Sequence, residues 1–229
     1  MSRLYINDVL TSGQKTVFTK LGAFKRIGIM AGGTALSFRL PERSEGWRRT
    51  NVLRVKHRRS YDFDIFTLNK IAENLSWEAK KIFGKKIKVI QDSENELTFF
   101  TPLKFKVTFF YYPFKPVYKI IKTSSISIFD WRDIAADKAY TLGRRPIWRD
   151  YVDLFFIIKK GHGLKKIIHD AWKKFTGLFS EKLFLGQLIY FGDLHNFKID
   201  FLGEDFQSLE IKKFFEKEVR KYKKEILKL

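Results

Sequence analysis

The chain has 229 residues and no cysteine, which excludes disulfides, zinc sites built on thiolates and a cysteine nucleophile. Hydrophobic residues make up 45% of the chain and aromatic residues 17%, which supports a packed core and excludes a disordered protein. The formal net charge is +20, and residues 1–60 alone hold 13 Lys and Arg against 3 Asp and Glu, so we expect a polyanionic partner such as nucleic acid, a nucleoside triphosphate or an acidic protein.

The apolar stretches of the chain are short. None approaches the roughly 18 residues that a membrane span needs. The N-terminus also lacks a basic start followed by an apolar block and a cleavage site of small residues, which is the layout of a signal peptide. We therefore expect a cytoplasmic protein without a membrane partner.

Strands and helices alternate in the first part of the chain. A helix capped by Thr11 or Ser12 is expected at residues 12–21, and an apolar strand at residues 27–30. The Gly32–Gly33 pair then opens a run that is compatible with a helix. This order of strand, glycines and helix is the layout of a phosphate-binding turn, in which the free N–H groups of the helix face an anion.

Residues 41–58 are predicted to form a polar loop or arm, because they combine Pro41, Gly46 and five arginines with little periodicity. Arginine is suited to phosphate because its planar guanidinium donates two parallel hydrogen bonds. This segment is therefore a candidate contact for RNA. The candidate RNA-binding residues are Arg48, Arg49, Arg54 and Arg58.

The next elements follow from the periodicity of the apolar residues. A strand is expected at residues 62–66, and an amphipathic helix at residues 68–83. The strands expected after this helix lie at residues 86–92, 96–101, 104–113 and 125–129. The helices expected from Asp130 onward lie at residues 130–142, 146–160 with Pro146 in the first turn, 164–175, 180–191 and 208–227.

This order of elements predicts an α+β protein with two domains. Residues 1–129 are expected to form an α/β core with a mixed β-sheet flanked by helices. Residues 130–229 are expected to form a C-terminal helical bundle that completes the active site.

Two aspartates on the strand at residues 62–66 are the candidate metal ligands. Residues i and i+2 of a strand point to the same face, so Asp62 and Asp64 project together while Phe63 and Ile65 point to the buried side. Two carboxylates on one face suit a hard cation such as Mg²⁺, which takes its remaining oxygen ligands from water and substrate phosphates. The alternative is an exposed strand face or a turn cap, since D-x-D by itself is a common pattern.

The pattern "GGTAL…HRRSYDFDIF" resembles the nucleotidyltransferases of the DNA polymerase β superfamily, in which a glycine turn opens a helix and D-x-D lies on the next strand. The downstream segment "DIAADKAYTLGRRPIWRDYVDLFFI" is similar to the helical motif of the AbiEii/AbiGii abortive-infection toxin family. The resemblance covers residues 27–195 in order and implies a nucleotidyltransferase-like fold.

The same resemblance implies roles for particular residues. Asp62 and Asp64 are expected to hold Mg²⁺ or Mn²⁺. The lysine of the helical motif, Lys138, is expected to touch the triphosphate, and Asp150 is the acid of the R-D-x-x-D-L motif. The residues expected to bind the nucleotide and its phosphates are Gly32, Gly33, Thr34, Arg59, Ser60 and Lys138.

Both helical residues have alternative interpretations. Lys138 fits a solvated helix position, and Asp150 fits a surface pair with Arg149 or Lys138. Within a catalytic site, Asp150 is suited to orienting Lys138, to completing the metal site or to accepting a proton. Asp153 competes for that role, because residues three apart lie on nearly the same helix face.

The resemblance implies a metal-dependent nucleotidyltransferase that transfers a nucleoside monophosphate from a nucleoside triphosphate to an acceptor hydroxyl. The expected acceptor is RNA at the 3′ end of tRNA, and the expected role is that of a toxin with a cognate antitoxin protein. The alternatives are a catalytically weak module that binds RNA or an antitoxin, and a nucleotidyltransferase that modifies a protein side chain.

Two departures from the superfamily's pattern stand out. The spacing from Gly33 to Asp62 is longer than usual, which places residues 41–58 in an insertion. Polymerase-like members also carry a third carboxylate on a neighbouring strand, whereas "KFKVTFFYYP" has none. A helical acid such as Asp150 is the candidate substitute.

Overall fold

The structure is a computed structural model that describes residues 4–38, 58–202 and 205–227, and these residues form two compact units. The first unit contains the described residues up to residue 38 together with residues 60–131. The second unit contains Arg58, Arg59 and the described residues from Arg132 onward. Three candidate RNA-binding residues, Arg48, Arg49 and Arg54, lie outside the described residues.

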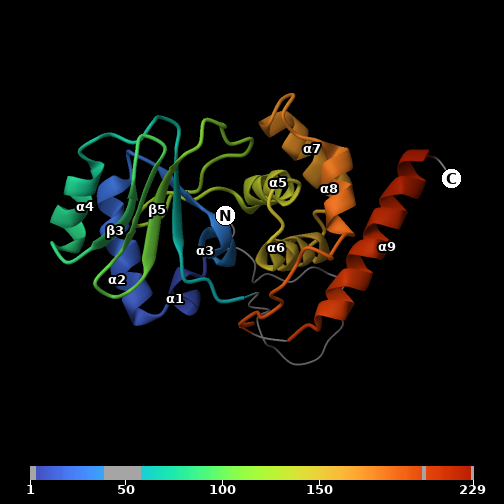
Figure 1. Cartoon of the computed structure of the whole chain (residues 1–229), viewed down its shortest axis with the longest axis horizontal. Coiled ribbons are helices and arrows are strands. Elements are labelled where there is room, and N and C mark those ends of the chain that lie inside the picture. Colours follow the sequence, from blue (N-terminus) through green and yellow to red (C-terminus); the bar gives the residue numbers. More distant parts are fainter. Residues whose placement is uncertain (1–3, 39–57, 203–204, 228–229) are drawn as a thin grey trace. The chain divides into compact units, whose positions relative to one another are not determined.

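The first unit is built on a five-stranded mixed sheet (Figure 1). Its strands are β1 (Ile29–Ala31), β2 (Phe63–Thr67), β3 (Lys88–Asp92), β4 (Glu96–Phe100) and β5 (Lys106–Tyr111). They lie in the order β1-β2-β5-β4-β3, with β2 and β5 parallel and the other neighbours antiparallel. The predicted α+β class is therefore confirmed, as are the strands predicted at residues 86–92 and 96–101, which correspond to β3 and β4.

The helices of the first unit include the predicted phosphate-turn helix. They are α1 (Ile6–Val9), α2 (Ser12–Leu21), the 3₁₀ turn η1 (Gly22–Phe24), α3 (Gly32–Ser37) and α4 (Leu75–Phe83). Helix α2 begins with a capping box, in which Thr11 and Gln14 satisfy each other's backbone N–H groups. The expected helix at residues 12–21 and its Thr11 cap are thus confirmed.

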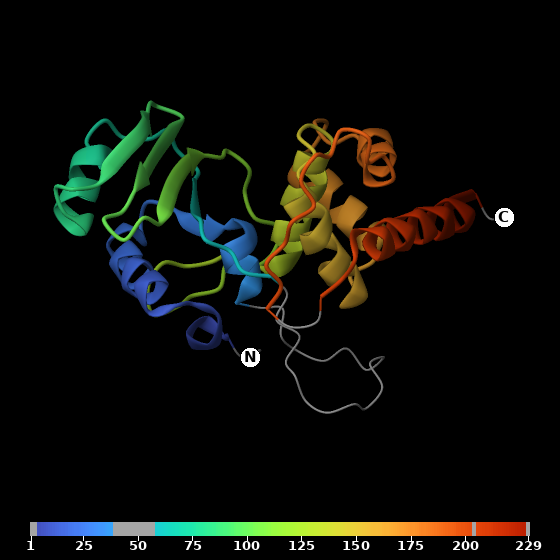
Figure 2. The same cartoon turned by 60° about the horizontal axis from the view of Figure 1, so that its bottom comes forward.

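One face of the sheet carries the core of the first unit. The ring of Phe24 contacts Phe83 of α4 and Phe109 of β5, and Phe83 also contacts Phe99 of β4. These aromatic contacts place η1 and α4 on this face, and the two views agree on α4 (Figures 1 and 2). The alternate residues of the strands point to the opposite face, which includes the exposed Phe100 and Phe110.

The predicted helix at residues 68–83 is too long, since α4 begins at Leu75. The preceding residues turn instead, because their polar groups bond outside any helix. The backbone N–H of Ile71 donates to the Glu94 carbonyl at 2.7 Å, and the Thr67 hydroxyl donates to the Asn69 carbonyl at 2.8 Å. Leu68 and Ile71 follow helical spacing without forming a helix.

The predicted strand at residues 125–129 is also wrong. Ile128 makes isolated bridges to Met30 and Ile121 but belongs to no strand. Side chains compete with a regular ladder in this segment, since the Thr123 hydroxyl donates to the Ile126 carbonyl and the Ser125 hydroxyl donates to the Phe18 carbonyl.

The described residues of the second unit are mostly helical. Its helices are α5 (Trp131–Leu142), α6 (Trp148–Lys159), α7 (Leu164–Lys174), α8 (Glu181–Leu188) and α9 (Ser208–Leu227). Helix α6 begins two residues after Pro146, with Ile147 as its N-cap. The predicted helix at residues 180–191 ends early, because the buried Tyr151 hydroxyl contacts the Gln187 and Tyr190 carbonyls at 2.7 and 3.1 Å.

Residues 189–202, which follow α8, pack aromatic side chains on α6. The ring of Phe197 contacts Trp148, and the ring of Phe201 contacts Phe156. Phe201 also makes an antiparallel bridge to Arg58. Within the described ranges, no helix combines the length and the hydropathy that crossing a bilayer requires.

A buried histidine makes the stability of the second unit depend on pH. His162 Nε2 lies 3.0 Å from Asp170 Oδ2, and both side chains are buried. Burial lowers the pKa of His162 and outweighs the opposing effect of Asp170. Just below the ordinary pKa of about 6.5, the unfolded chain therefore binds more protons than the native state. The free energy of unfolding decreases as the pH decreases through that range.

We expect the free energy of unfolding to decrease as the pH falls below about 6.5, and His162→Gln to weaken this dependence. Urea unfolding of both proteins between pH 7.5 and pH 5 measures it. An equal pH dependence in the two proteins would contradict the assignment to His162.

Candidate active site

Two helices fix the backbone that leads into β2. The side-chain amide of Gln14, next to the cap of α2, donates to the Ser60 carbonyl at 2.7 Å. The Thr34 hydroxyl of α3 donates to the Asp62 carbonyl at 2.5 Å. These two bonds fix the backbone at Ser60 and at Asp62. The backbone conformation in turn determines the direction of the Asp62 side chain.

The alternation predicted for β2 is observed. Phe63, Ile65 and Thr67 are buried, whereas Asp62 and Asp64 are half-buried on the opposite face. This is the sheet face that α4 and η1 leave uncovered. The two carboxylates are therefore directed to one side, as the sequence predicted.

The glycine bend lies directly against one of these carboxylates. Ala31 of β1 pairs with Asp64 of β2, and the next residue, Gly32, has φ +67°. A Cβ atom on Gly32 would lie 2.4 Å from Asp64 Oδ2, which is too close for any side chain. Glycine is thus required at this position both for its backbone conformation and for the space that Asp64 occupies.

We expect Gly32→Ala to abolish the nucleotide transfer that the family resemblance implies, and to cost about 1–2 kcal/mol of stability from the positive φ alone. The matched control is Gly177→Ala, since Gly177 has φ +76° but open space around its Cβ position. Denaturant unfolding and transfer assays compare the two variants. Transfer by Gly32→Ala at the level of the Gly177→Ala control would show that the contact with Asp64 is unimportant.

The neighbouring strand β5 adds a cation to the carboxylate face. Thr108 lies in register with Asp64, and Lys106 Nζ is 3.6 Å from Asp62 Oδ2. Both partners of this ion pair remain partly exposed, at 37% and 26%. Lys106 was not predicted from the sequence. Its position two residues before Thr108 gives the correct face, but only the pairing of β5 with β2 shows which residues it approaches.

The carboxylate face fits a divalent cation. Carboxylate oxygens are the ligands that Mg²⁺ and Mn²⁺ prefer, and a site with few protein ligands leaves positions for water and phosphate oxygens. Among the described residues, no group of three or more His, Cys, Asp or Glu is arranged to hold a metal ion. Asp62 and Asp64 would therefore hold the ion without a third protein carboxylate from the described residues.

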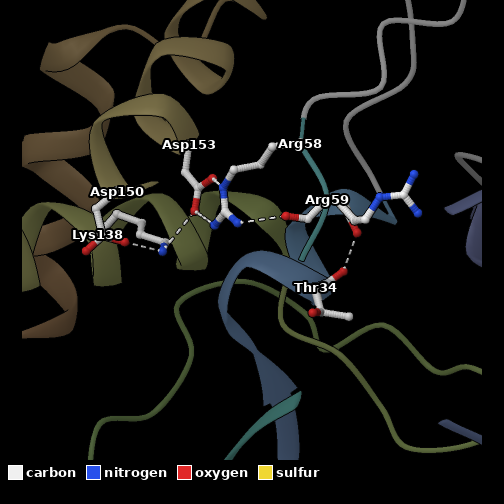
Figure 3. A network of polar contacts seen from close by, with 7 residues as sticks. Thr34, Arg58, Arg59, Lys138, Asp150 and Asp153 are labelled. Atoms are coloured by element: carbon white, nitrogen blue, oxygen red, sulfur yellow. Dashed lines mark hydrogen bonds and ion pairs between the residues drawn. The ribbon is translucent and has the colours of Figure 1, made fainter. Parts of the chain in front are cut away.

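A second polar cluster lies within the helical unit (Figure 3). Lys138 of α5 contacts both acids of the R-D-x-x-D-L motif on α6: it donates to Asp150 Oδ1, and its Nζ is 2.9 Å from Asp153 Oδ2. Arg58 binds the same Asp153 through two bonds, Nε to Oδ1 at 2.7 Å and Nη2 to Oδ2 at 2.8 Å. Asp153 is thus shared by two cations.

Burial separates these residues into different roles. The side chains of Arg58 and Asp153 are 3% and 0% exposed, whereas those of Lys138 and Asp150 are 12% and 9% exposed. Arg58 is therefore placed for an internal ion pair and not for the predicted contact with RNA. Asp153 is the inner anchor of the cluster, and Asp150 lies nearer the surface.

Lys138 remains a cation in this cluster. Burial by itself lowers the pKa of Lys138, but the carboxylates of Asp150 and Asp153 more than offset it, so the pKa is raised above its usual value. A lysine of this kind does not act as a general base near neutral pH. It supplies a fixed positive charge, and it is not the solvated helix residue of the alternative interpretation.

The remaining predicted residues have defined positions. Thr34 is buried, and its hydroxyl proton is used in the bond to Asp62, so it positions the strand. Ser60 is half-buried, and Gly33 is buried at the start of α3. Arg59 faces the α8–α9 connection, with Nε 3.0 Å from Asp200 Oδ2 and its backbone N–H bonded to the Asp200 carbonyl.

Comparison with known proteins agrees with this architecture. No protein-family model matches the chain. A relative from Aquifex aeolicus (strain VF5), the uncharacterized protein aq_aa25, is 28% identical over 199 residues, which is 84% of this chain and 86% of the relative.

Two solved structures share the fold over nearly the whole chain. The nucleotidyltransferase toxin MenT4 (Rv2826c) from Mycobacterium tuberculosis H37Rv aligns with a TM-score of 0.56 at 12% identity, covering 96% of this chain and 84% of that one. A candidate nucleotidyltransferase from H. pylori aligns with a TM-score of 0.51 at 16% identity, covering 94% and 98%. The chain therefore has a nucleotidyltransferase-like fold.

Proposed function

We propose that this protein is a metal-dependent nucleotidyltransferase. The observation that carries the proposal is the position of Asp64 beside the Gly32 bend, with Asp62 half-buried on the same face of the sheet. The nucleotidyltransferase-like fold supports it, because the chain shares that fold with MenT4 and with the H. pylori protein.

The reaction joins an acceptor hydroxyl to the α-phosphorus of a nucleoside triphosphate. A new bond forms between the acceptor oxygen and the α-phosphorus, the bond from that phosphorus to the bridging oxygen of the β-phosphate breaks, and pyrophosphate leaves. The hydroxyl proton passes to a base or to water. A divalent ion, when bound, supplies positive charge where the phosphate oxygens gain negative charge.

Residues of this chain would hold the reactants. Asp62 and Asp64 would hold the metal ion, which would supply positive charge to the triphosphate. The backbone N–H groups at the Gly32–Gly33 bend are suited to a phosphate oxygen. Lys138 contributes a fixed positive charge that favours the leaving pyrophosphate, and Asp150 and Asp153 orient it.

The proposed acceptor is RNA, with the 3′ end of tRNA as the specific candidate. The net charge of +20 supports a polyanionic substrate. MenT4 is named as a toxin, and by analogy we propose that this chain acts as the toxin of a toxin–antitoxin or abortive-infection system of the AbiEii type, with a cognate antitoxin protein.

A second candidate is a catalytically weak module that binds RNA or an antitoxin on the same scaffold. Lys106 favours it, because a cation 3.6 Å from Asp62 weakens the attraction of this carboxylate for a metal ion. Titration with Mn²⁺ and a nucleoside triphosphate distinguishes the two candidates, since a pure binding module shows no uptake that depends on Asp62 and Asp64.

The acceptor is tested by incubating the protein with each labelled nucleoside triphosphate and either total RNA or total protein. The proposal predicts label in the RNA pool. Label in the protein pool would identify a nucleotidyltransferase that modifies a protein side chain. Label in neither pool, with the metal and all four triphosphates present, would contradict the proposed function.

A further inference from the structure

Helix α9 presents a continuous basic stripe. Lys213, Lys217, Arg220 and Lys224 recur at intervals of four, three and four residues, which is the spacing of one helix face, and all four are exposed. The stripe extends for about 16 Å along the helix. A shallow hollow on this face is lined by Lys213, Glu216, Lys217, Arg220, Lys221 and Lys224.

The stripe carries positive charge for which the described residues supply no ion-pair partner. Within the described parts of the chain, no ion pair engages these four side chains or Lys221. Of the acids of α9, Glu225 pairs with Lys165 of α7 at 3.0 Å, and Glu216 lines the same hollow as the cations, so cations outnumber acids there.

The opposite face of α9 is committed to the core of the second unit. Ile211, Phe215, Val219 and Tyr222 are buried, and the helix packs against α6, α7 and α8 (Figure 2). An amphipathic helix that binds a membrane buries its apolar face among lipids. That face of α9 is already covered, so the stripe is available for a charged partner and not for insertion into a bilayer.

We propose that the α9 stripe binds the phosphate backbone of the RNA acceptor. Cations spaced along a helix at about 4.5–6 Å match a polymer that carries a regular series of negative charges. This inference rests on the proposed function for the choice of RNA over an acidic protein. The proposed RNA-binding surface lies outside the Asp62 and Asp64 face and outside the cluster around Lys138.

The test measures binding of a fluorescently labelled tRNA transcript in the absence of nucleotide. The variant Lys213→Gln/Lys217→Gln/Lys224→Gln removes three cations of the stripe. We expect its affinity to fall by about 10- to 100-fold at 0.1 M salt, and the slope of log K against log salt to decrease by about two to three.

Matched variants separate position from total charge. Lys80→Gln/Lys85→Gln/Lys86→Gln removes the same charge from exposed positions of the first unit and should keep most of the affinity and the slope. Lys213→Arg/Lys217→Arg/Lys224→Arg keeps the charge on the stripe and should retain binding. Circular dichroism checks the fold of each variant.

The outcomes distinguish this inference from the proposed function. If the stripe variant binds the transcript with the affinity and salt slope of the parent, the inference is wrong, whether or not the parent transfers nucleotide. The same follows if the two glutamine variants lose affinity equally, or if the parent binds anionic vesicles and not RNA. If the stripe variant alone loses binding while the parent transfers no nucleotide, the result supports RNA binding by the α9 stripe and contradicts the proposed nucleotidyl transfer.

Discussion

Replacement of Asp64 by asparagine is expected to lower nucleotide transfer by about a thousand-fold or more. Asparagine keeps the shape of the side chain, including its close approach to Gly32, but removes the negative charge that holds the metal ion. Metal ions contribute several kcal/mol to the stabilisation of charge in a phosphoryl-transfer transition state, and about 4 kcal/mol corresponds to a thousand-fold in rate. Single-turnover assays with saturating nucleoside triphosphate measure this loss.

The control for this variant is Asp92→Asn, which removes an equal charge from an exposed position of strand β3. We expect Asp92→Asn to transfer nucleotide like the parent, and Asp62→Asn to behave like Asp64→Asn. Circular dichroism and denaturant unfolding should show that both active-site variants remain folded. If the two single variants Asp62→Asn and Asp64→Asn both transferred nucleotide at the rate of the parent, these residues would have no role in the reaction.

Replacement of Asp153 by alanine is expected to destabilise the second unit by about 3–5 kcal/mol. Breaking a buried ion pair by removing one partner leaves an uncompensated charge in a poorly solvated site. Asp153 forms ion pairs with both Arg58 and Lys138. Its loss would therefore remove a carboxylate partner from two buried cations. The midpoint of urea unfolding measures the effect.

Two further variants make this prediction specific. Arg58→Met/Asp153→Leu removes both members of the pair and should recover much of the lost stability, because no charge remains unpaired between them. Glu94→Gln removes the ion pair with Lys70, in which both side chains are more than half exposed, and should cost less than about 1 kcal/mol. A loss in Asp153→Ala no larger than in Glu94→Gln would show that the cluster does not stabilise the fold.

The fold was predictable where the pattern of one segment determines its structure. The capping box at Thr11 and Gln14 and the alternation around Phe63 and Ile65 are local, and both were confirmed. The errors have non-local causes. Residues 68–74 follow helical spacing, but the N–H of Ile71 bonds to Glu94, a residue more than twenty positions away. No local pattern contains that partner.

In the candidate site, too, the features that depend on one segment could be predicted, and those that depend on distant segments could not. The pairing of Asp62 and Asp64 on one face follows from strand geometry alone. The ion pair of Lys106 with Asp62 depends on the parallel pairing of β5 with β2, which the sequence does not specify. Arg58 was misassigned for the same reason: its position in a basic segment indicated a contact with RNA, whereas its partner, Asp153, lies 95 residues further along the chain.

The central claim, that the Asp62 and Asp64 face supports nucleotidyl transfer, is tested most directly with two labels. The protein is incubated with total RNA, Mg²⁺ and a nucleoside triphosphate labelled either on the α-phosphate or on the γ-phosphate. We predict that the α-label enters RNA, that the γ-label appears only in pyrophosphate, and that Asp64→Asn prevents both. Entry of the γ-label into the acceptor, or α-label transfer by Asp64→Asn at the parental rate, would contradict this claim.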